Sequence, residues 1–416
     1  MTLSFESFGL HPALLKALQN KAYAQSTPIQ QSAIPEALAG KDVLASAQTG
    51  SGKTAAFALP ILQQLAVQTL FSPRRTLALV LVPTRELAMQ VGEVFKQLGH
   101  HLPQAVQITT LFGGVSINPQ MMRLRGGSDV VVATPGRLLD LVDRNALALS
   151  YVETLVLDEA DRLLDMGFAG EIERILSLIP AKRQNLFFSA TFPSAVQQLA
   201  NTLLTDPVRI DVQPEVENAA DITQRAVLVD APSRTQLLRH LIEENKWSRV
   251  LVFVATKHAA EMVAVKLRKV RINAEPFHGE QSQGKRVQVL ADFKASRLTV
   301  VVATDVAARG LDIASLPVVV NFDLPRSAVD YTHRIGRTGR AGERGLAVSF
   351  VSSDMQAHWQ LIQKRQDMHV ALDLVAGFEP SQEVIDVSFS NGGIKGKRPS
   401  KKDKLRAAAQ LIKSNT

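Results

Sequence analysis

The 416-residue sequence contains no cysteine, which excludes disulfide bonds and thiolate metal ligands and fits a reducing compartment. Long apolar runs are also lacking. Even TLALVLVP at 76–83 is far shorter than the ~20 residues that a membrane span requires. At the N-terminus, no basic stretch precedes an apolar run, so no secretory signal is visible. These absences predict a soluble, cytoplasmic protein without a membrane partner.

Positive charge is concentrated at one end of the chain. The formal net charge is +8. Residues 391–416 carry eight Lys or Arg against one Asp, a balance of +7 (8 − 1), which leaves about +1 (8 − 7) for the rest. Such a tail suits a polyanion such as nucleic acid. A solvated end that only aids solubility is the alternative, and charge alone does not separate the two.

Short apolar runs rich in β-branched residues alternate with amphipathic, helix-like segments. The runs that resemble buried parallel strands lie at 42–47, 76–83, 129–135, 154–160, 185–191, 249–257, 298–305 and 317–323. Two of the helix-like segments lie at 85–99 and 169–179. This alternation predicts an α/β fold with doubly wound parallel sheets, in which ligands bind beyond the carboxyl ends of the strands.

The alternation pauses over 205–221, a polar segment with two prolines, where we place a linker between domains. We therefore predict a first domain at 1–212 and a second at 219–368. An extension and a basic tail, expected to be disordered, follow at 369–416.

A glycine-rich segment, AQTGSGKT at 47–54, follows the first apolar run. Backbone N–H groups of such a loop can cradle phosphates at a helix N-terminus. Lys53 would reach the β- and γ-phosphates, and the Thr54 hydroxyl would bind Mg²⁺. The strict G-x-x-x-x-G-K-[ST] pattern requires glycine where this chain has Ala47. A chance glycine-rich turn is the alternative.

Carboxylates end another apolar run, TLVLDEAD at 154–161. Near a phosphate loop, Asp158 suits Mg²⁺ coordination, and Glu159 suits the orientation or deprotonation of an attacking water. Asp161 is better placed to contact another loop than the metal. An acidic helix N-terminus is the simpler alternative, which the presence of Lys53 and Thr54 disfavours.

Seven motifs occur in the order typical of the DEAD-box RNA helicases. They are AQTGSGKT (47–54), PTRELA (83–88), TPGR (134–137), DEAD (158–161), SAT (189–191), ATDVAARGLD (303–312) and HRIGRTGR (333–340). The sequence resembles this family over about residues 5 to 350, and is most similar to its bacterial RhlE-like branch. The resemblance implies two tandem RecA-like domains, Mg²⁺-ATP, and RNA bound largely independently of sequence.

The resemblance implies ATP-dependent unwinding of short RNA duplexes or remodelling of ribonucleoproteins. Two alternatives remain open: an ATP-gated RNA clamp or assembly factor with little unwinding, and a DNA translocase of the same superfamily. The basic tail would be an auxiliary RNA contact. The sequence does not specify ribosomal or RNA-decay partners.

The resemblance also assigns roles to individual residues. Nucleotide contacts are implied for Phe5, Gln30, Ala47, Gln48, Thr49, Gly50, Ser51, Gly52, Lys53, Thr54, Gly310 and Asp312. RNA contacts are implied for Thr84, Arg85, Gly113, Gly114, Thr134, Arg137, Thr256, His278, Gly279, Gln283, Arg286, Thr304 and Asp305. Coupling between hydrolysis and strand separation is implied for Asp161, Ser189, Thr191 and His333. Arg337 and Arg340 resemble arginine fingers that reach the γ-phosphate across the cleft, whereas we expect a structural or interdomain contact for Arg334.

Overall fold

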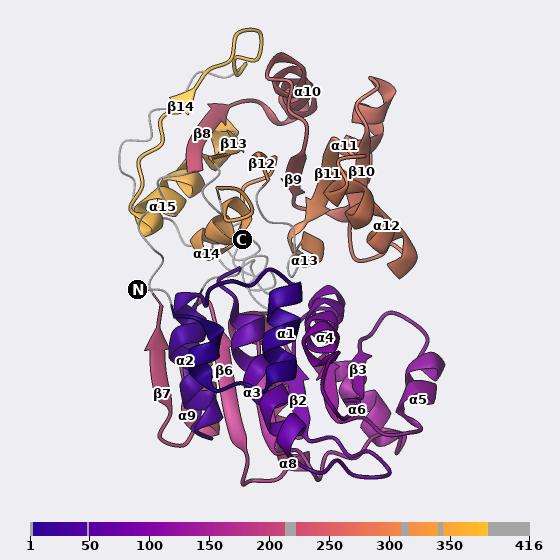
Figure 1. Cartoon of the computed structure of the whole chain (residues 1–416). Coiled ribbons are helices and arrows are strands. Elements are labelled where there is room, and N and C mark those ends of the chain that lie inside the picture. Colours follow the sequence, from indigo (N-terminus) through magenta and orange to yellow (C-terminus); the bar gives the residue numbers. More distant parts are fainter. Residues whose placement is uncertain (1–2, 48–49, 213–221, 309–315, 340–343, 382–416) are drawn as a thin grey trace, which may run out of the picture.

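The computed structural model describes residues 3–47, 50–212, 222–308, 316–339 and 344–381. These residues form two α/β domains, each built on a seven-stranded sheet (Figure 1). Every strand pair in both sheets is parallel. The prediction of tandem doubly wound domains is therefore confirmed.

The first domain has the sheet order β3-β4-β2-β5-β6-β1-β7. Its strands are β1 (Val43–Ser46), β2 (Ala78–Leu81), β3 (Ile108–Leu111), β4 (Val130–Ala133), β5 (Thr154–Leu157), β6 (Gln184–Ser189) and β7 (Val208–Asp211). Its helices are the 3-10 helix η1 (Phe5–Phe8), α1 (Pro12–Asn20), α2 (Pro28–Leu38), α3 (Lys53–Val67), α4 (Arg85–Gly99), α5 (Asn118–Leu124), α6 (Pro135–Asp143), α7 (Ala160–Asp165), α8 (Ala169–Leu178) and α9 (Ser194–Leu203).

The second domain has the sheet order β10-β11-β9-β12-β13-β8-β14. Its strands are β8 (Ile222–Leu228), β9 (Val250–Val254), β10 (Ala274–Phe277), β11 (Val300–Thr304), β12 (Val318–Asn321), β13 (Gly345–Val351) and β14 (Leu372–Asp373). Its helices are η3 (Ala231–Ser233), α10 (Arg234–Glu244), α11 (Lys257–Lys269), α12 (Gln283–Lys294), α13 (Asp305–Ala308), α14 (Ala328–Ile335), η4 (Ser353–Met355) and α15 (Gln356–Gln366).

Helices cover both faces of each sheet, which explains why the central strands are apolar at every position. In β2, Val80 packs into a core that includes residues of α1 to α4, whereas Leu79 and Leu81 pack into a second core with α6, α8 and α9. In the second sheet, Val252 and Phe253 belong to opposite cores in the same way. Because all strands are parallel, their carboxyl ends share one edge, where polar loops can gather.

The structure extends both domains beyond the regular sequence pattern. Strand β7 lies within the polar pause at 205–221 and pairs with β1. Strand β14 lies beyond residue 368 and pairs with β8, while Val375 packs into the core of the second domain. Both strands are at sheet edges and have few buried residues, so the hydrophobic pattern does not reveal them. The domain boundary and the basic tail lie partly or wholly outside the described residues.

Among the described residues, none of the helices combines the length and the apolar character that crossing a lipid bilayer requires.

Candidate nucleotide and RNA site

The phosphate loop connects β1 to α3, and its geometry requires glycine at position 52. Gly52 has φ +96°, and a Cβ there would lie 2.5 Å from Nε2 of Gln30. That amide donates to the carbonyl of Gly52 at 3.1 Å, while Oε1 of Gln30 accepts from the backbone N–H of Thr27 at 3.0 Å. The Gln30 side chain therefore supports the loop, whose residues Gln48 and Thr49 lie outside the described part.

Lys53 begins α3 and points back over the loop. It is buried, and its Nζ donates to the carbonyl of Ala47 at 2.7 Å. Thr54 follows on the first turn and is partly exposed. A lysine and a hydroxyl at the N-terminus of a helix form an anion site with a place for a cation beside it.

Three carboxylates, Asp158, Glu159 and Asp161, follow β5 at the same edge of the sheet. Burial raises the pKa of Asp158 to about 7, the charge of Lys53 opposes this shift, and Glu159 and Asp161 add to it. Glu159 occupies the left-handed backbone region, with φ 53° and ψ 51°, a conformation that costs energy in a non-glycine residue and is frequent at functional sites. The local structure thus concentrates negative charge next to the phosphate loop.

These residues fit a magnesium ion. A buried carboxylate with a raised pKa is stabilised in its ionised form by a nearby cation, and carboxylate and hydroxyl oxygens are ligands that Mg²⁺ accepts. Among the described residues there is no group of three or more His, Cys, Asp or Glu that could hold a metal alone. Mg²⁺ needs only one or two protein ligands, because phosphate and water complete its shell.

Asp161 contacts the end of β6 and the segment that follows it. Its Oδ2 accepts from the backbone N–H and the hydroxyl of Thr191, at 3.1 and 2.8 Å. The backbone N–H of Asp161 donates to Ser189 Oγ at 3.2 Å. A shift of one segment would therefore move the other, and the coupling role of these residues stays a prediction.

The second domain presents His333 and Arg337 to the acidic cluster. Both line a small interdomain cavity together with Arg162 of the first domain. Burial and, next to it, the charge of Arg162 lower the pKa of His333 to about 4, against the opposing effect of Asp161 and Glu159. His333 is therefore neutral at pH 7. Arg340, Gly310 and Asp312 lie outside the described residues.

Arg334 stabilises the second domain from within. Its Nε and Nη2 donate to the two oxygens of Asp305, both at 2.6 Å, and its Nη1 donates to Oδ1 of Asn321 at 3.1 Å. This agrees with the structural contact that we expected for Arg334. The same bidentate pair occupies the carboxylate of Asp305, for which we had predicted an RNA contact.

Basic and glycine residues for which RNA contacts are predicted lie together at the carboxyl edge of the first sheet. Gly114 has φ +78°, and a Cβ there would lie 2.9 Å from Nη1 of Arg85. Arg137 donates from Nη2 to the carbonyl of Val115 at 2.8 Å, and its Nε and Nη1 are buried without a hydrogen bond in the described part. Thr84 and Thr134 cap α4 and α6. Guanidinium groups that keep N–H donors without a hydrogen bond, as Arg137 does among the described residues, suit phosphate oxygens.

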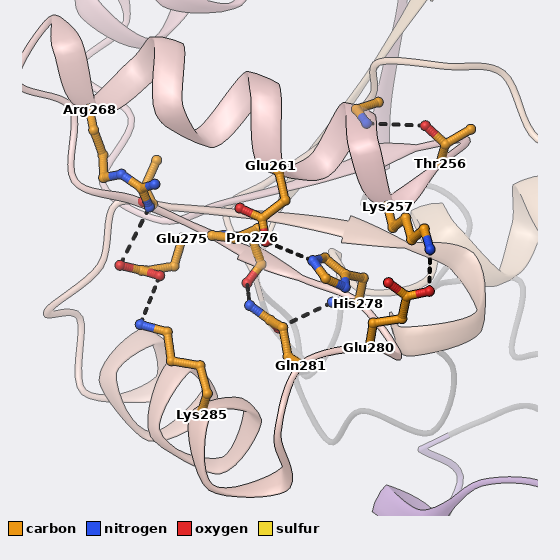
Figure 2. A network of polar contacts seen from close by, with 12 residues as sticks. Thr256, Lys257, Glu261, Arg268, Glu275, Pro276, His278, Glu280, Gln281 and Lys285 are labelled. Atoms are coloured by element: carbon orange, nitrogen blue, oxygen red, sulfur yellow. Dashed lines mark hydrogen bonds and ion pairs between the residues drawn. The ribbon is translucent and has the colours of Figure 1, made fainter. Parts of the chain in front are cut away.

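In the second domain, hydrogen bonds fix the segment from Pro276 to Gln281 (Figure 2). Nε2 of His278 contacts Oε1 of Glu261 at 2.8 Å. The Gln281 side chain donates to the carbonyl of Pro276 at 3.0 Å and accepts from the N–H of His278 at 3.2 Å. Thr256 caps the neighbouring helix α11. The predicted RNA segment is therefore rigid, although His278 itself is 7% exposed.

The two domains contact each other through α4 and α12. Nη1 of Arg286 pairs with Oε1 of Glu86 at 2.9 Å, and their side chains are only 2% and 6% exposed. Nη2 of Arg85 donates to the carbonyl of Gly279 at 3.1 Å, and Gln283 contacts Met89. In this arrangement Arg286 pairs with Glu86, and the RNA contact predicted for it stays a prediction.

Glu86 is the residue of this interface that motif reasoning missed. It lies within PTRELA, where sequence alone suggests only a surface partner for Arg85. In the structure Glu86 is buried and pairs with Arg286, two hundred positions further along the chain (286 − 86). This contact becomes visible only when the two domains are placed together.

The first domain has a phosphate loop and an acidic strand end, and a second parallel-sheet domain faces them. Together these features define a two-domain RecA-like nucleoside triphosphatase. The family model of the DEAD/DEAH box helicases matches residues 27–199, and that of the helicase conserved C-terminal domain matches 233–342. DEAD-box ATP-dependent RNA helicase CshA from Bacillus cereus is 39% identical over 93% of this chain and 74% of the relative. The chain belongs to the DEAD-box ATP-dependent RNA helicases.

Other relatives are longer than the matched part. CshA from Bacillus subtilis is 38% identical over 92% of this chain and 77% of the relative. ATP-dependent RNA helicase DeaD from Buchnera aphidicola is 42% identical, but only 57% of it is covered. These relatives do not test the placement in the RhlE-like branch, which stays a prediction.

Solved structures place the domains in a similar arrangement. Dbp5 from S. cerevisiae, bound to RNA and ADP BeF3, has a TM-score of 0.79 and 31% identity over 89% of this chain and 95% of its own. Mss116p, bound to ssRNA and AMP-PNP, has a TM-score of 0.81 and 28% identity over 92% of this chain and 81% of its own. Because these matches extend over both domains, the present arrangement is close to those of the ligand-bound relatives.

Proposed function

We propose that this DEAD-box helicase binds ATP on its first domain and RNA across both domains, and that domain closure drives local unwinding. The observation that carries this proposal is the cavity where His333 and Arg337 of the second domain meet Arg162 of the first. Residues from both domains complete the hydrolysis site only when the cleft is closed. RNA that favours closure would therefore stimulate hydrolysis, and ATP would strengthen RNA binding by the same factor.

On the first domain, Lys53 and the loop N–H groups would hold the phosphates, and Asp158 and Thr54 would hold Mg²⁺. Mg²⁺ held by these residues would supply positive charge against the negative charge of the phosphates. Glu159 would orient the attacking water. From the second domain, Arg337 would stabilise the charge of the transition state, together with Arg340 by its motif position.

RNA would lie along Arg85, Gly114 and Arg137 of the first domain and the segment around Gly279 of the second. These groups offer guanidinium and backbone donors, which suit phosphates and carry no base information. We therefore propose largely sequence-independent binding. From charge alone, residues 391–416 would add a salt-sensitive RNA contact. The cytoplasmic location stays a prediction.

Parallel assays of ATP turnover and strand release test this function. A short RNA duplex with a single-stranded extension should stimulate hydrolysis by the full chain, and its strands should separate in the presence of ATP. Hydrolysis and tight RNA binding without strand release would instead indicate an ATP-gated clamp. Equal stimulation by a DNA duplex would contradict the assignment to RNA and support a DNA translocase.

The buried pair of Glu86 and Arg286 gives a prediction about closure. Replacing Arg286 by glutamine removes the nearer of the two cations beside the buried Glu86 and leaves only Arg85, whose Nε lies 3.6 Å from Oε1 of Glu86 in the closed form, which is unfavourable for a buried charge. We expect RNA affinity in the presence of a non-hydrolysable ATP analogue to fall about 10- to 100-fold, whereas RNA affinity without nucleotide stays close to wild type. Fluorescence anisotropy of labelled RNA, with and without the analogue, measures both values.

Two further variants control this experiment. Arg268 is an exposed arginine of the second domain that pairs with Glu275. Arg268→Gln should leave the RNA affinity unchanged, both with and without the ATP analogue. The exchanged pair Glu86→Arg with Arg286→Glu should recover part of the ATP-dependent affinity. If Arg286 contacts RNA directly, affinity will also fall without nucleotide, and the exchanged pair will not recover it.

A further inference from the structure

Arg162 follows the DEAD segment directly, and none of the motif roles above includes it. It lies on α7 and is 3% exposed. Its Nη1 donates to Oε2 of Glu159 at 2.9 Å, whereas its Nη2 is buried without a hydrogen bond in the described part of the chain. Burying a guanidinium with one unsatisfied arm is costly. Its position therefore calls for a reason beyond local folding.

The contact with Arg162 determines where the Glu159 carboxylate points. Only Oε2 is engaged, so among the contacts of the described residues Oε1 stays free to accept from a water molecule. Glu159 is 5% exposed and lies between Asp158 and Asp161. A carboxylate buried among like charges needs a paired cation. Arg162 supplies that charge and fixes one oxygen without blocking the other.

Residues of the second domain share a cavity with Arg162. His333, Arg337 and Phe253 line the interdomain cavity with it. The charge of Arg162 is one of the causes that lower the pKa of His333, so His333 adds no positive charge to this cavity at neutral pH. In an open cleft, an ion pair three residues apart on a helix is worth only a few tenths of a kcal/mol. Closure removes water from the pair and holds its geometry more firmly.

We propose that Arg162 is a positioning residue for hydrolysis: it holds Oε2 of Glu159 so that Oε1 is fixed for the attacking water when the second domain closes over the pair. Arg162 thus links closure to the orientation of the group that handles the water. This inference rests on the proposed function. It requires Arg162 to affect the chemical step and not the binding of ATP or RNA.

Replacing Arg162 by glutamine in the full chain tests the inference. We expect kcat of RNA-stimulated hydrolysis to fall about 10- to 100-fold, because a misplaced reacting group typically costs this much. Affinities for RNA and for a non-hydrolysable ATP analogue should stay within about twofold of wild type. Arg162→Lys keeps the charge but lacks the planar guanidinium. This second test variant should lower kcat less than Arg162→Gln does. Arg174→Gln, at an exposed arginine of the same domain paired with Asp143, should match wild type.

A double-mutant cycle separates positioning from a general structural role. Because Arg162 acts through Glu159, Arg162→Gln should lower the residual rate of the Glu159→Gln variant by much less than it lowers the wild-type rate. An equal factor in both backgrounds, an unchanged kcat, or a loss confined to nucleotide affinity would overturn the inference. The wild-type rate of RNA-stimulated hydrolysis tests the proposed function, whereas the ratios between variants test the positioning role of Arg162. Either hypothesis can therefore fail without the other.

Discussion

Replacement of Lys53 by alanine is expected to lower RNA-stimulated ATP hydrolysis by about a thousandfold. The Lys53 ammonium is buried at the start of α3, where it donates to the carbonyl of Ala47 and opposes the raised pKa of Asp158. Its removal takes away a fixed positive charge beside the phosphates and a neighbour that keeps Asp158 ionised. Both losses disfavour the charged transition state. Steady-state ATP turnover at saturating RNA measures the effect.

Lys41 provides the matched control, because it is an exposed lysine of the same domain that pairs with Glu36. Lys41→Ala should keep wild-type turnover. Both variants should unfold at nearly the same temperature, since Lys53 contributes one hydrogen bond to a loop. Wild-type turnover by Lys53→Ala would refute the assignment of this segment as the phosphate loop.

Much of the fold could be predicted because parallel strands covered on both faces are apolar at every position. The runs containing β2, β4 and β5 have this character. Two of the strands that escaped prediction, β10 and β14, lack it. Strand β10 contains Glu275 and Pro276, and β14 is only two residues long. Their pairing depends on the neighbouring strand, which a local pattern does not encode.

For the site residues too, prediction from sequence depends on whether their contacts are local. Lys53 and Asp158 could be predicted because each belongs to a short segment whose chemistry is local. The RNA contact of Arg286 was implied by the family resemblance, whereas in the structure Arg286 lies on α12 and pairs with Glu86 of the first domain. Arg162 carried no local signal, since its partners are one preceding carboxylate and the face of another domain. Contacts that form between domains depend on a placement that no local segment specifies.

Replacing Glu159 by glutamine is expected to stop hydrolysis while leaving ATP and RNA binding intact. The amide keeps the shape of the side chain and can still accept from Arg162, but it cannot take a proton from water. Loss of a general base typically costs about 10²- to 10⁴-fold. Glu159 is one of the charges that raise the pKa of Asp158, so its removal favours the ionised form of Asp158. Nucleotide affinity should therefore not fall.

The variant should accumulate in the ATP-bound, closed form, so its RNA complex should dissociate more slowly with ATP than that of wild type. Single-turnover hydrolysis and the dissociation rate of labelled RNA measure the two effects. Glu153 is exposed and directly precedes the first residue of β5, at the end of the strand opposite to Glu159. Glu153→Gln should therefore behave as wild type. Normal turnover by Glu159→Gln would remove Glu159 from the chemical step. Loss of a residue of the chemical step alone should block hydrolysis and also prolong the closed complex. If turnover and ATP affinity instead fell together, Glu159 would be assigned to nucleotide binding.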